Sequence, residues 1–70
     1  AMTAQEINQH LSAGGVCQVT TYQRSTVYTE DHAGWFVDKR DGLYVRRGKS
    51  LDYLGPNDRP YVGIRLGGYQ

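Results

Sequence analysis

Cysteine is almost absent from this 70-residue chain, and its scarcity excludes two common ways of stabilising so small a protein. Cys17 is the single cysteine, and there are two histidines. One thiol cannot form an intramolecular disulfide, and so few thiol and imidazole ligands argue against a structural zinc site. A domain near the lower size limit must then be held by well-packed sheet contacts, by oligomerisation, or by both.

Long apolar segments are missing too. No stretch approaches the roughly 20 residues that span a bilayer, and no basic segment followed by an apolar run resembles a signal peptide. Ala1 before Met2 is typical of a residue left after tag removal, so we expect the native chain to start at Met2. Together with the unpaired thiol, these features predict a cytoplasmic protein that does not bind membranes.

A large excess of one charge is also lacking, since the net charge is +1. A non-specific duplex-binding protein is usually far more basic. The charge is nevertheless unevenly distributed: residues 1–33 hold one basic side chain against three acidic ones, whereas residues 34–70 hold seven against four. Any anionic partner is therefore expected to bind the second half of the chain.

The first element that the sequence predicts is a short helix over residues 3–13. Thr3 and Glu6 form a capping-box pattern, and Gly14-Gly15 is a typical helix end. The apolar residues at helical spacing are Ala4, Ile7 and Leu11. Such a helix is marginal alone in water, so we expect it to cover one end of a sheet or to dock on a partner.

From Val16 onward, β-branched and aromatic residues occur in short runs separated by turn residues, which is typical of strands. Asp41-Gly42 is a strong signal for a type I′ hairpin. Residues 48–60 are predicted to form a loop, with a short turn or 3₁₀ segment at Leu51, Tyr53 and Leu54, and residues 67–70 a loose tail. The five predicted strands cover residues 16–22, 25–30, 35–40, 43–47 and 61–66.

One helix followed by five strands, with no second helix to cross over, predicts antiparallel pairing within a single domain over residues 1–70. The fold class is mostly β, or α+β by count. The expected architecture over residues 16–66 is a strongly bent five-stranded antiparallel sheet or a small SH3-like barrel.

Strand alternation predicts which side chains share a face. A two-residue Asp41-Gly42 loop pairs Lys39 with Tyr44 and Val37 with Arg46. The expected core combines Phe36, Leu43 and Val45 with Cys17 and Val19, and with Val62, Ile64 and Leu66 from the last strand. The opposite face is then expected to carry Trp35, Lys39, Tyr44, Arg46, Tyr61 and Arg65.

Interleaved aromatic and basic residues in the second half of the chain are the clearest functional signal. Rings can stack on bases, and guanidinium groups can pair with phosphates. Arg46 to Lys49 has the composition of a phosphate-contacting turn, although the spacing of a Walker loop is absent. The predicted contacts to a nucleic acid or protein partner are Trp35, Lys39, Tyr44, Arg46, Arg47, Lys49, Tyr61 and Arg65.

No catalytic arrangement is evident in the sequence. Cys17 has no evident activating histidine or lysine, and no spacing brings Asp38 and Asp52 together. His32 follows Glu30 and Asp31 in what is typical of a turn. We therefore expect a protein that is not an enzyme and that needs no metal or cofactor.

These observations predict a small binding protein that contacts single-stranded RNA or DNA. One alternative is a protein-interaction module, such as an inhibitor or regulator from a phage or mobile element, that uses the same Trp/Tyr/Arg surface. Another is a homo-oligomeric structural protein. The same residue types also occur on the ordinary solvated face of a small sheet.

Overall fold

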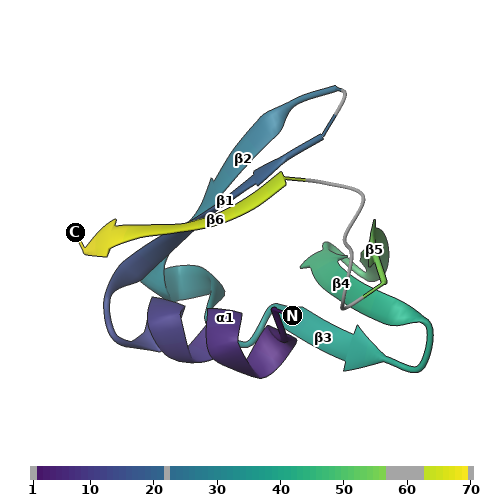
Figure 1. Cartoon of the computed structure of the whole chain (residues 1–70), viewed down its shortest axis with the longest axis horizontal. Coiled ribbons are helices and arrows are strands. Elements are labelled where there is room, and N and C mark those ends of the chain that lie inside the picture. Colours follow the sequence, from purple (N-terminus) through teal and green to yellow (C-terminus); the bar gives the residue numbers. More distant parts are fainter. Residues whose placement is uncertain (1, 22, 57–62, 70) are drawn as a thin grey trace.

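The computed structural model describes residues 2–21, 23–56 and 63–69, which form one helix, one 3₁₀ turn and six strands (Figure 1). The elements in chain order are α1 (Ala4–Ser12), β1 (Gly15–Thr20), β2 (Ser25–Tyr28), η1 (Glu30–His32), β3 (Phe36–Lys39), β4 (Gly42–Arg47), β5 (Ser50–Gly55) and β6 (Gly63–Tyr69).

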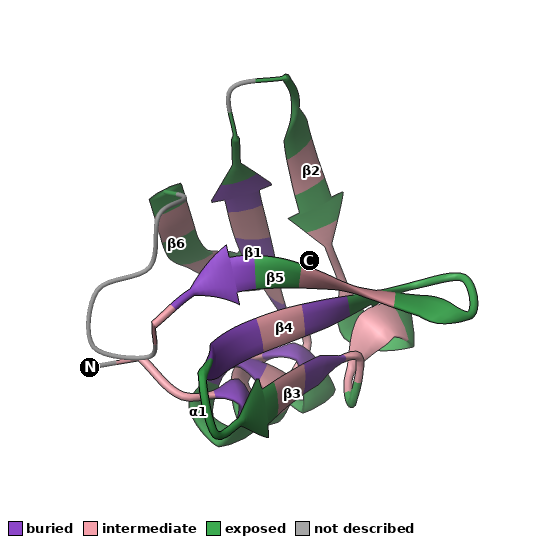
Figure 2. Cartoon of the chain, turned by 90° about the vertical axis from the view of Figure 1, so that its right-hand side faces the viewer, coloured by how far each residue is buried: buried purple, intermediate pink, exposed green. Residues whose placement is uncertain are grey.

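The six strands belong to two three-stranded antiparallel sheets, in the orders β2-β1-β6 and β3-β4-β5. In Figure 2, β5 crosses in front of β1, and β3 lies in front of α1. The prediction of a mostly β protein with an N-terminal helix and antiparallel pairing is confirmed. The prediction of one five-stranded sheet is wrong, and the described strands do not close into an SH3-like barrel. The chain leaves the first sheet at η1, and β3 then starts the second sheet instead of pairing with β2.

Helix α1 is held against β3 by polar side chains. As predicted, the Thr3 hydroxyl caps the helix and accepts the Glu6 N–H at 3.2 Å. Both carboxylate oxygens of Asp38 in β3 accept the Ala4 N–H at 3.1 Å. The Asn8 side chain donates to the Phe36 carbonyl at 2.9 Å and accepts the Phe36 N–H at 3.3 Å. Asn8 thus satisfies main-chain groups at the outer edge of β3, as a neighbouring strand would.

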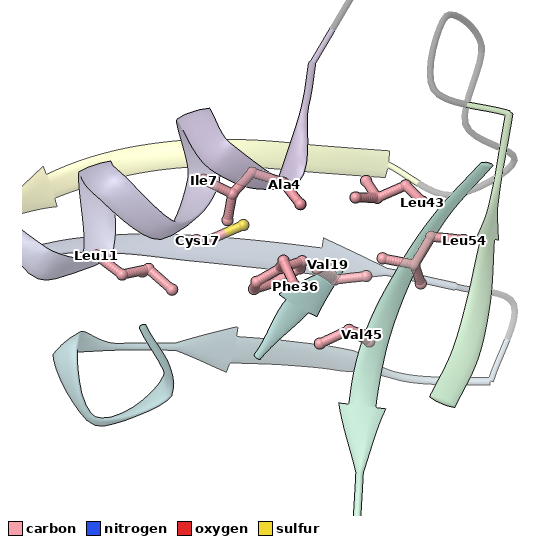
Figure 3. Close-up of a cluster of buried hydrophobic side chains, with 9 residues drawn as sticks. All are labelled: Ala4, Ile7, Leu11, Cys17, Val19, Phe36, Leu43, Val45 and Leu54. Carbon is pink, nitrogen blue, oxygen red and sulfur yellow. The ribbon is translucent and has the colours of Figure 1, made fainter. Parts of the chain in front are cut away.

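The core lies between α1 and the two sheets (Figure 3). Its buried side chains are Ala4, Ile7, Leu11, Cys17, Val19, Phe36, Leu43, Val45 and Leu54. Each large apolar side chain contributes about 1.5–3 kcal/mol on full burial. The predicted core positions on β1, β3 and β4 are confirmed.

The predicted core contribution of the last strand is only partly correct. Ile64 packs against the core, but Leu66 is 38% exposed. The reason is that β6 is an edge strand of its sheet, so a neighbouring strand covers it on one side only. Val62 lies outside the described residues. The strand also reaches Tyr69, where a loose tail was predicted, and its Gly67 pairs with Val16.

The β3–β4 hairpin is offset by two residues from the predicted register. Val37 pairs with Tyr44 and Lys39 pairs with Gly42, so the turn is Arg40-Asp41. A type I′ turn needs positive φ at both central residues, but no described residue other than glycine has it. Because the offset is an even number, the side chains of β3 and β4 stay on their predicted faces. Trp35 precedes β3 and was predicted on the outward-facing side, but it packs against the core.

Strand β5 was missed by the sequence prediction, which gave a loop with a 3₁₀ segment over this region. Arg47 pairs with Ser50 across the Gly48-Lys49 turn, and Gly48 has a φ of 59°. The pairing shifts between Leu43 and Tyr44, and Leu54 is buried in the core. Leu51 faces outward, whereas Asp52 and the buried Leu54 face inward. The segment therefore lacks the regular alternation of apolar and polar residues that identifies a half-buried strand in a sequence.

Candidate nucleic-acid interface

Two tyrosines occupy the centre of the outward-facing side of the β3-β4-β5 sheet. Tyr44 pairs with Val37 on one side and with Tyr53 on the other. The tyrosine ring centroids are 5.1 Å apart with planes tilted by 46°, and Tyr53 is 41% exposed. We call this side of the sheet the outer face; it consists of Val37, Lys39, Tyr44, Arg46, Leu51 and Tyr53.

Both phenol groups are anchored to the β3–β4 turn. The Tyr44 hydroxyl donates to the Asp41 carboxylate at 2.8 Å, and the Tyr53 hydroxyl donates to the Asp41 carbonyl at 2.9 Å. The hydrogen bond to Asp41 raises the pKa of Tyr44 above its usual value. At Gly42, a Cβ atom would lie 2.7 Å from a ring carbon of Tyr53. Glycine at that position therefore lets the Tyr53 ring lie close to the strand, and the rings are oriented before any ligand binds.

Cations flank the two rings. The Lys39 ammonium lies 5.7 Å from the centroid of the Tyr44 ring, within the range of a cation–π contact. Arg46 is exposed, and its Nε donates to the Gly48 carbonyl at 3.2 Å. Lys49 is exposed at the β4–β5 turn. An aromatic centre with basic side chains around it also occurs in proteins that bind single-stranded nucleic acids.

The nearby aspartates are engaged elsewhere. Asp38 accepts the hydrogen bonds from the first turn of α1, and Asp52 forms an ion pair with Arg47, with Nε and Oδ1 2.9 Å apart. The structure therefore separates Asp38 from Asp52. Asp41 lies beside the outer face, where it holds the two phenols.

The structure brings together three of the residues predicted to share one face, namely Lys39, Tyr44 and Arg46. Trp35 is half-buried against the core, with its ring edge-on to His32 at a centroid distance of 4.6 Å. Arg65 lies in the other sheet, paired with Gln18.

The remaining predicted contacts lie at other places. Arg47 alternates with Arg46 and extends from the opposite side of β4, where Asp52 binds it. Lys49 occupies the β4–β5 turn. Tyr61 is outside the described residues. Sequence reasoning missed Tyr53 and Leu51 because residues 48–60 read as a loop. Their period-two spacing directly after a glycine turn is the signal that would have found them.

A cleft of about 400 Å³ lies between the two sheets. The buried side chains Val19, Val45 and Leu54 contribute apolar surface to it. Its charged and hydroxyl-bearing lining includes Arg24, Tyr28, Arg47, Asp52 and Tyr53. The cleft therefore combines apolar surface with both signs of charge.

Other chemistry finds little support in the described part of the chain. Burial raises the pKa of the Cys17 thiol to about 11, which keeps it protonated and a poor nucleophile. Across residues 2–21, 23–56 and 63–69, no three His, Cys, Asp or Glu side chains are placed to hold a metal ion. The same ranges contain no helix of the length and apolarity needed to cross a membrane. Comparison with protein-family models, curated proteins and solved structures found no match.

Proposed function

We propose that the protein binds single-stranded RNA or DNA on the outer face of its β3-β4-β5 sheet. The observation that carries the proposal is the adjacent pair of anchored rings, Tyr44 and Tyr53, between Lys39 and Arg46. Stacking of one base on an aromatic side chain contributes about 1–3 kcal/mol. The flanking cations lie where they can contact the phosphates on either side of the stacked bases.

The charge arrangement supports a single strand over a duplex. Stacking needs the flat face of a base, which neighbouring base pairs cover in a double helix. A duplex-binding protein relies instead on many phosphate contacts, whereas this chain has a net charge of only +1. A few cations around two rings suit a ligand of a few unpaired nucleotides.

Fluorescence anisotropy of a labelled oligonucleotide at two salt concentrations tests the proposal. The informative variant is Tyr53→Ala, since this ring is exposed and extends from an edge strand. Loss of one stacking platform should weaken binding by roughly 5- to 150-fold. The matched control is Val27→Ala, because Val27 lies on the other sheet and is 54% exposed. This variant should bind the oligonucleotide as tightly as the unmodified protein does. Absence of binding at low salt, or equal binding by Tyr53→Ala, contradicts the proposal.

A protein partner is the second candidate, and the edge strand β2 favours it. This strand lies at the margin of the first sheet, and its Val27 is the most exposed large apolar residue described. An extended segment of an inhibited or regulated protein, or of a second copy of this chain, can add to such an edge through main-chain hydrogen bonds. A Val27→Lys variant should abolish pull-down of such a partner or self-association in light scattering. Identical behaviour of the variant and the unmodified protein would exclude this edge.

A further inference from the structure

Tyr53 belongs both to the outer face and to the lining of the cleft between the sheets. The ring of Tyr53 contacts Tyr44 on the outer face, and the same residue lines the cleft. Strand β5 is an edge strand, so a bound chain can pass over it from one surface to the other. A nucleic-acid strand stacked on the two tyrosines therefore lies next to a residue that also lines the cleft.

The chemistry of the cleft resembles that of a nucleobase pocket. Val45 and Leu54, which are 2% and 3% exposed, form part of its apolar lining. Arg24 and Arg47 both line the cleft and supply positive charge for the phosphates next to an inserted base. The volume of about 400 Å³ is within the usual range of small-ligand pockets.

Asp52 gives the cleft a hydrogen-bond acceptor. Its Oδ1 accepts from Arg47 at 2.9 Å, whereas its Oδ2 accepts no hydrogen bond from the residues that the structure describes. The Asp52 side chain is 35% exposed, so a ligand can reach it. An ionised carboxylate accepts from amino groups and repels carbonyl oxygens, which is how acidic side chains recognise the N4 amino group of cytosine.

Tyr28 adds a second polar group to the cleft. Its ring packs edge-on against Phe36 at a centroid distance of 5.1 Å, which limits where its hydroxyl can lie. Burial, and then the negative charge of Asp52, raise the pKa of this phenol above its usual value. Tyr28 therefore remains a neutral hydroxyl that can donate to a ring nitrogen or carbonyl of a base.

We propose that this cleft takes one base of the bound single strand and that Asp52 makes it prefer cytosine over thymine or uracil. The proposal rests on the proposed function, because the strand must first bind the outer face. Cytosine presents an amino group where thymine and uracil present a carbonyl oxygen. The amino group of cytosine donates a hydrogen bond to the Asp52 carboxylate, whereas the carbonyl oxygen of thymine or uracil is repelled by it.

Anisotropy titrations with oligo(dC) and oligo(dT) of equal length test this preference. The unmodified protein should bind oligo(dC) at least about fivefold more tightly, as expected for one good base contact. In Asp52→Asn the preference should fall to less than about twofold, because an amide donates to a carbonyl as well as accepting from an amine. The ratio of the two affinities is the readout, since release of Arg47 from its ion pair affects both ligands alike.

The matched control is Arg47→Gln, which breaks the same ion pair but keeps the carboxylate. It should weaken binding of both oligonucleotides and leave their ratio unchanged. Equal binding of the two ligands by the unmodified protein, or a preference that survives Asp52→Asn, overturns the cytosine pocket while the outer face stands. Failure of both oligonucleotides to bind at low salt overturns the proposed function together with this inference.

Discussion

The two sheets have the same number of strands and the same antiparallel pairing, yet their outward-facing sides differ. The outer face of β3-β4-β5 carries Tyr44, Tyr53, Lys39 and Arg46. The corresponding side of β2-β1-β6 carries Gln18, Val27 and Arg65, which pair across the three strands without an aromatic ring. The fold therefore provides two platforms, and side-chain chemistry alone makes one of them a candidate site.

The edges of the two sheets differ as well. Asn8 of the helix satisfies the N–H and carbonyl of Phe36 at the edge of β3. Edge strand β2 instead carries the exposed Val27. A covered edge cannot recruit another strand, whereas an uncovered one can. The helix thus covers the β3 edge of the sheet that carries the candidate site.

The largest expected effect comes from the core that both sheets share. Leu43 is fully buried, so Leu43→Ala should cost about 2–5 kcal/mol of unfolding free energy. A domain of this size rarely has more than about 3–5 kcal/mol, so much of the variant should be unfolded. Urea titration followed by Trp35 fluorescence and by circular dichroism measures this. Two separate transitions for the unmodified protein would show that the sheets unfold independently and would contradict a shared core.

The second largest effect should come from the contact between α1 and β3. Asn8→Ala removes hydrogen bonds to Phe36 and to the Gly34 N–H, the latter 2.9 Å long. A loss of about 1–3 kcal/mol in the free energy of unfolding is expected, because partly buried main-chain groups lose their partners. The control is Gln9→Ala, an exposed position on the same helix. Equal unfolding curves for the two variants would show that Asn8 does not hold the β3 edge.

A smaller effect, on the salt dependence of oligonucleotide binding, should distinguish the outward-facing sides of the two sheets. Each phosphate contact to a single strand contributes about 0.7 to the slope of log affinity against log salt. Arg46→Gln should lower the slope for an oligonucleotide by about this amount. Arg65→Gln makes the same charge change on the other sheet and should leave the slope unchanged. An equal decrease in both variants would mean that binding follows net charge rather than the outer face.

A last effect is confined to alkaline pH and concerns the inward-facing side of β1. The pKa of Cys17 is about 11 in the folded protein against 9.0 for an ordinary thiol. Because the unfolded chain releases this proton first, the free energy of unfolding should fall as pH rises from 9 to 11. Cys17→Ala should make the fall shallower, as measured by urea titrations at several pH values. An unchanged pH dependence would show that the buried thiol does not contribute.

Local chemistry in the sequence was enough to predict several features correctly. The Thr3 cap and the apolar spacing of α1 involve residues within a few positions of one another. The inward positions of Phe36, Leu43 and Val45 follow from the two-residue period of a strand. They were predicted correctly although the hairpin register was wrong, because the register was offset by two residues and an even offset leaves each side chain on the same face. Features of this kind need no knowledge of distant segments.

The tertiary structure decided the rest, because it depends on contacts between residues far apart in sequence. Asp38 binds the first turn of α1 across 34 positions, and no local pattern reveals that role. The separation into two sheets depends on which strands pair after η1, and Tyr53 joins the candidate site only because β5 pairs with β4. The sequence determined by itself which side chains of α1, β1, β3 and β4 face inward. Packing of helix and sheets determined which outward-facing rings and cations became neighbours.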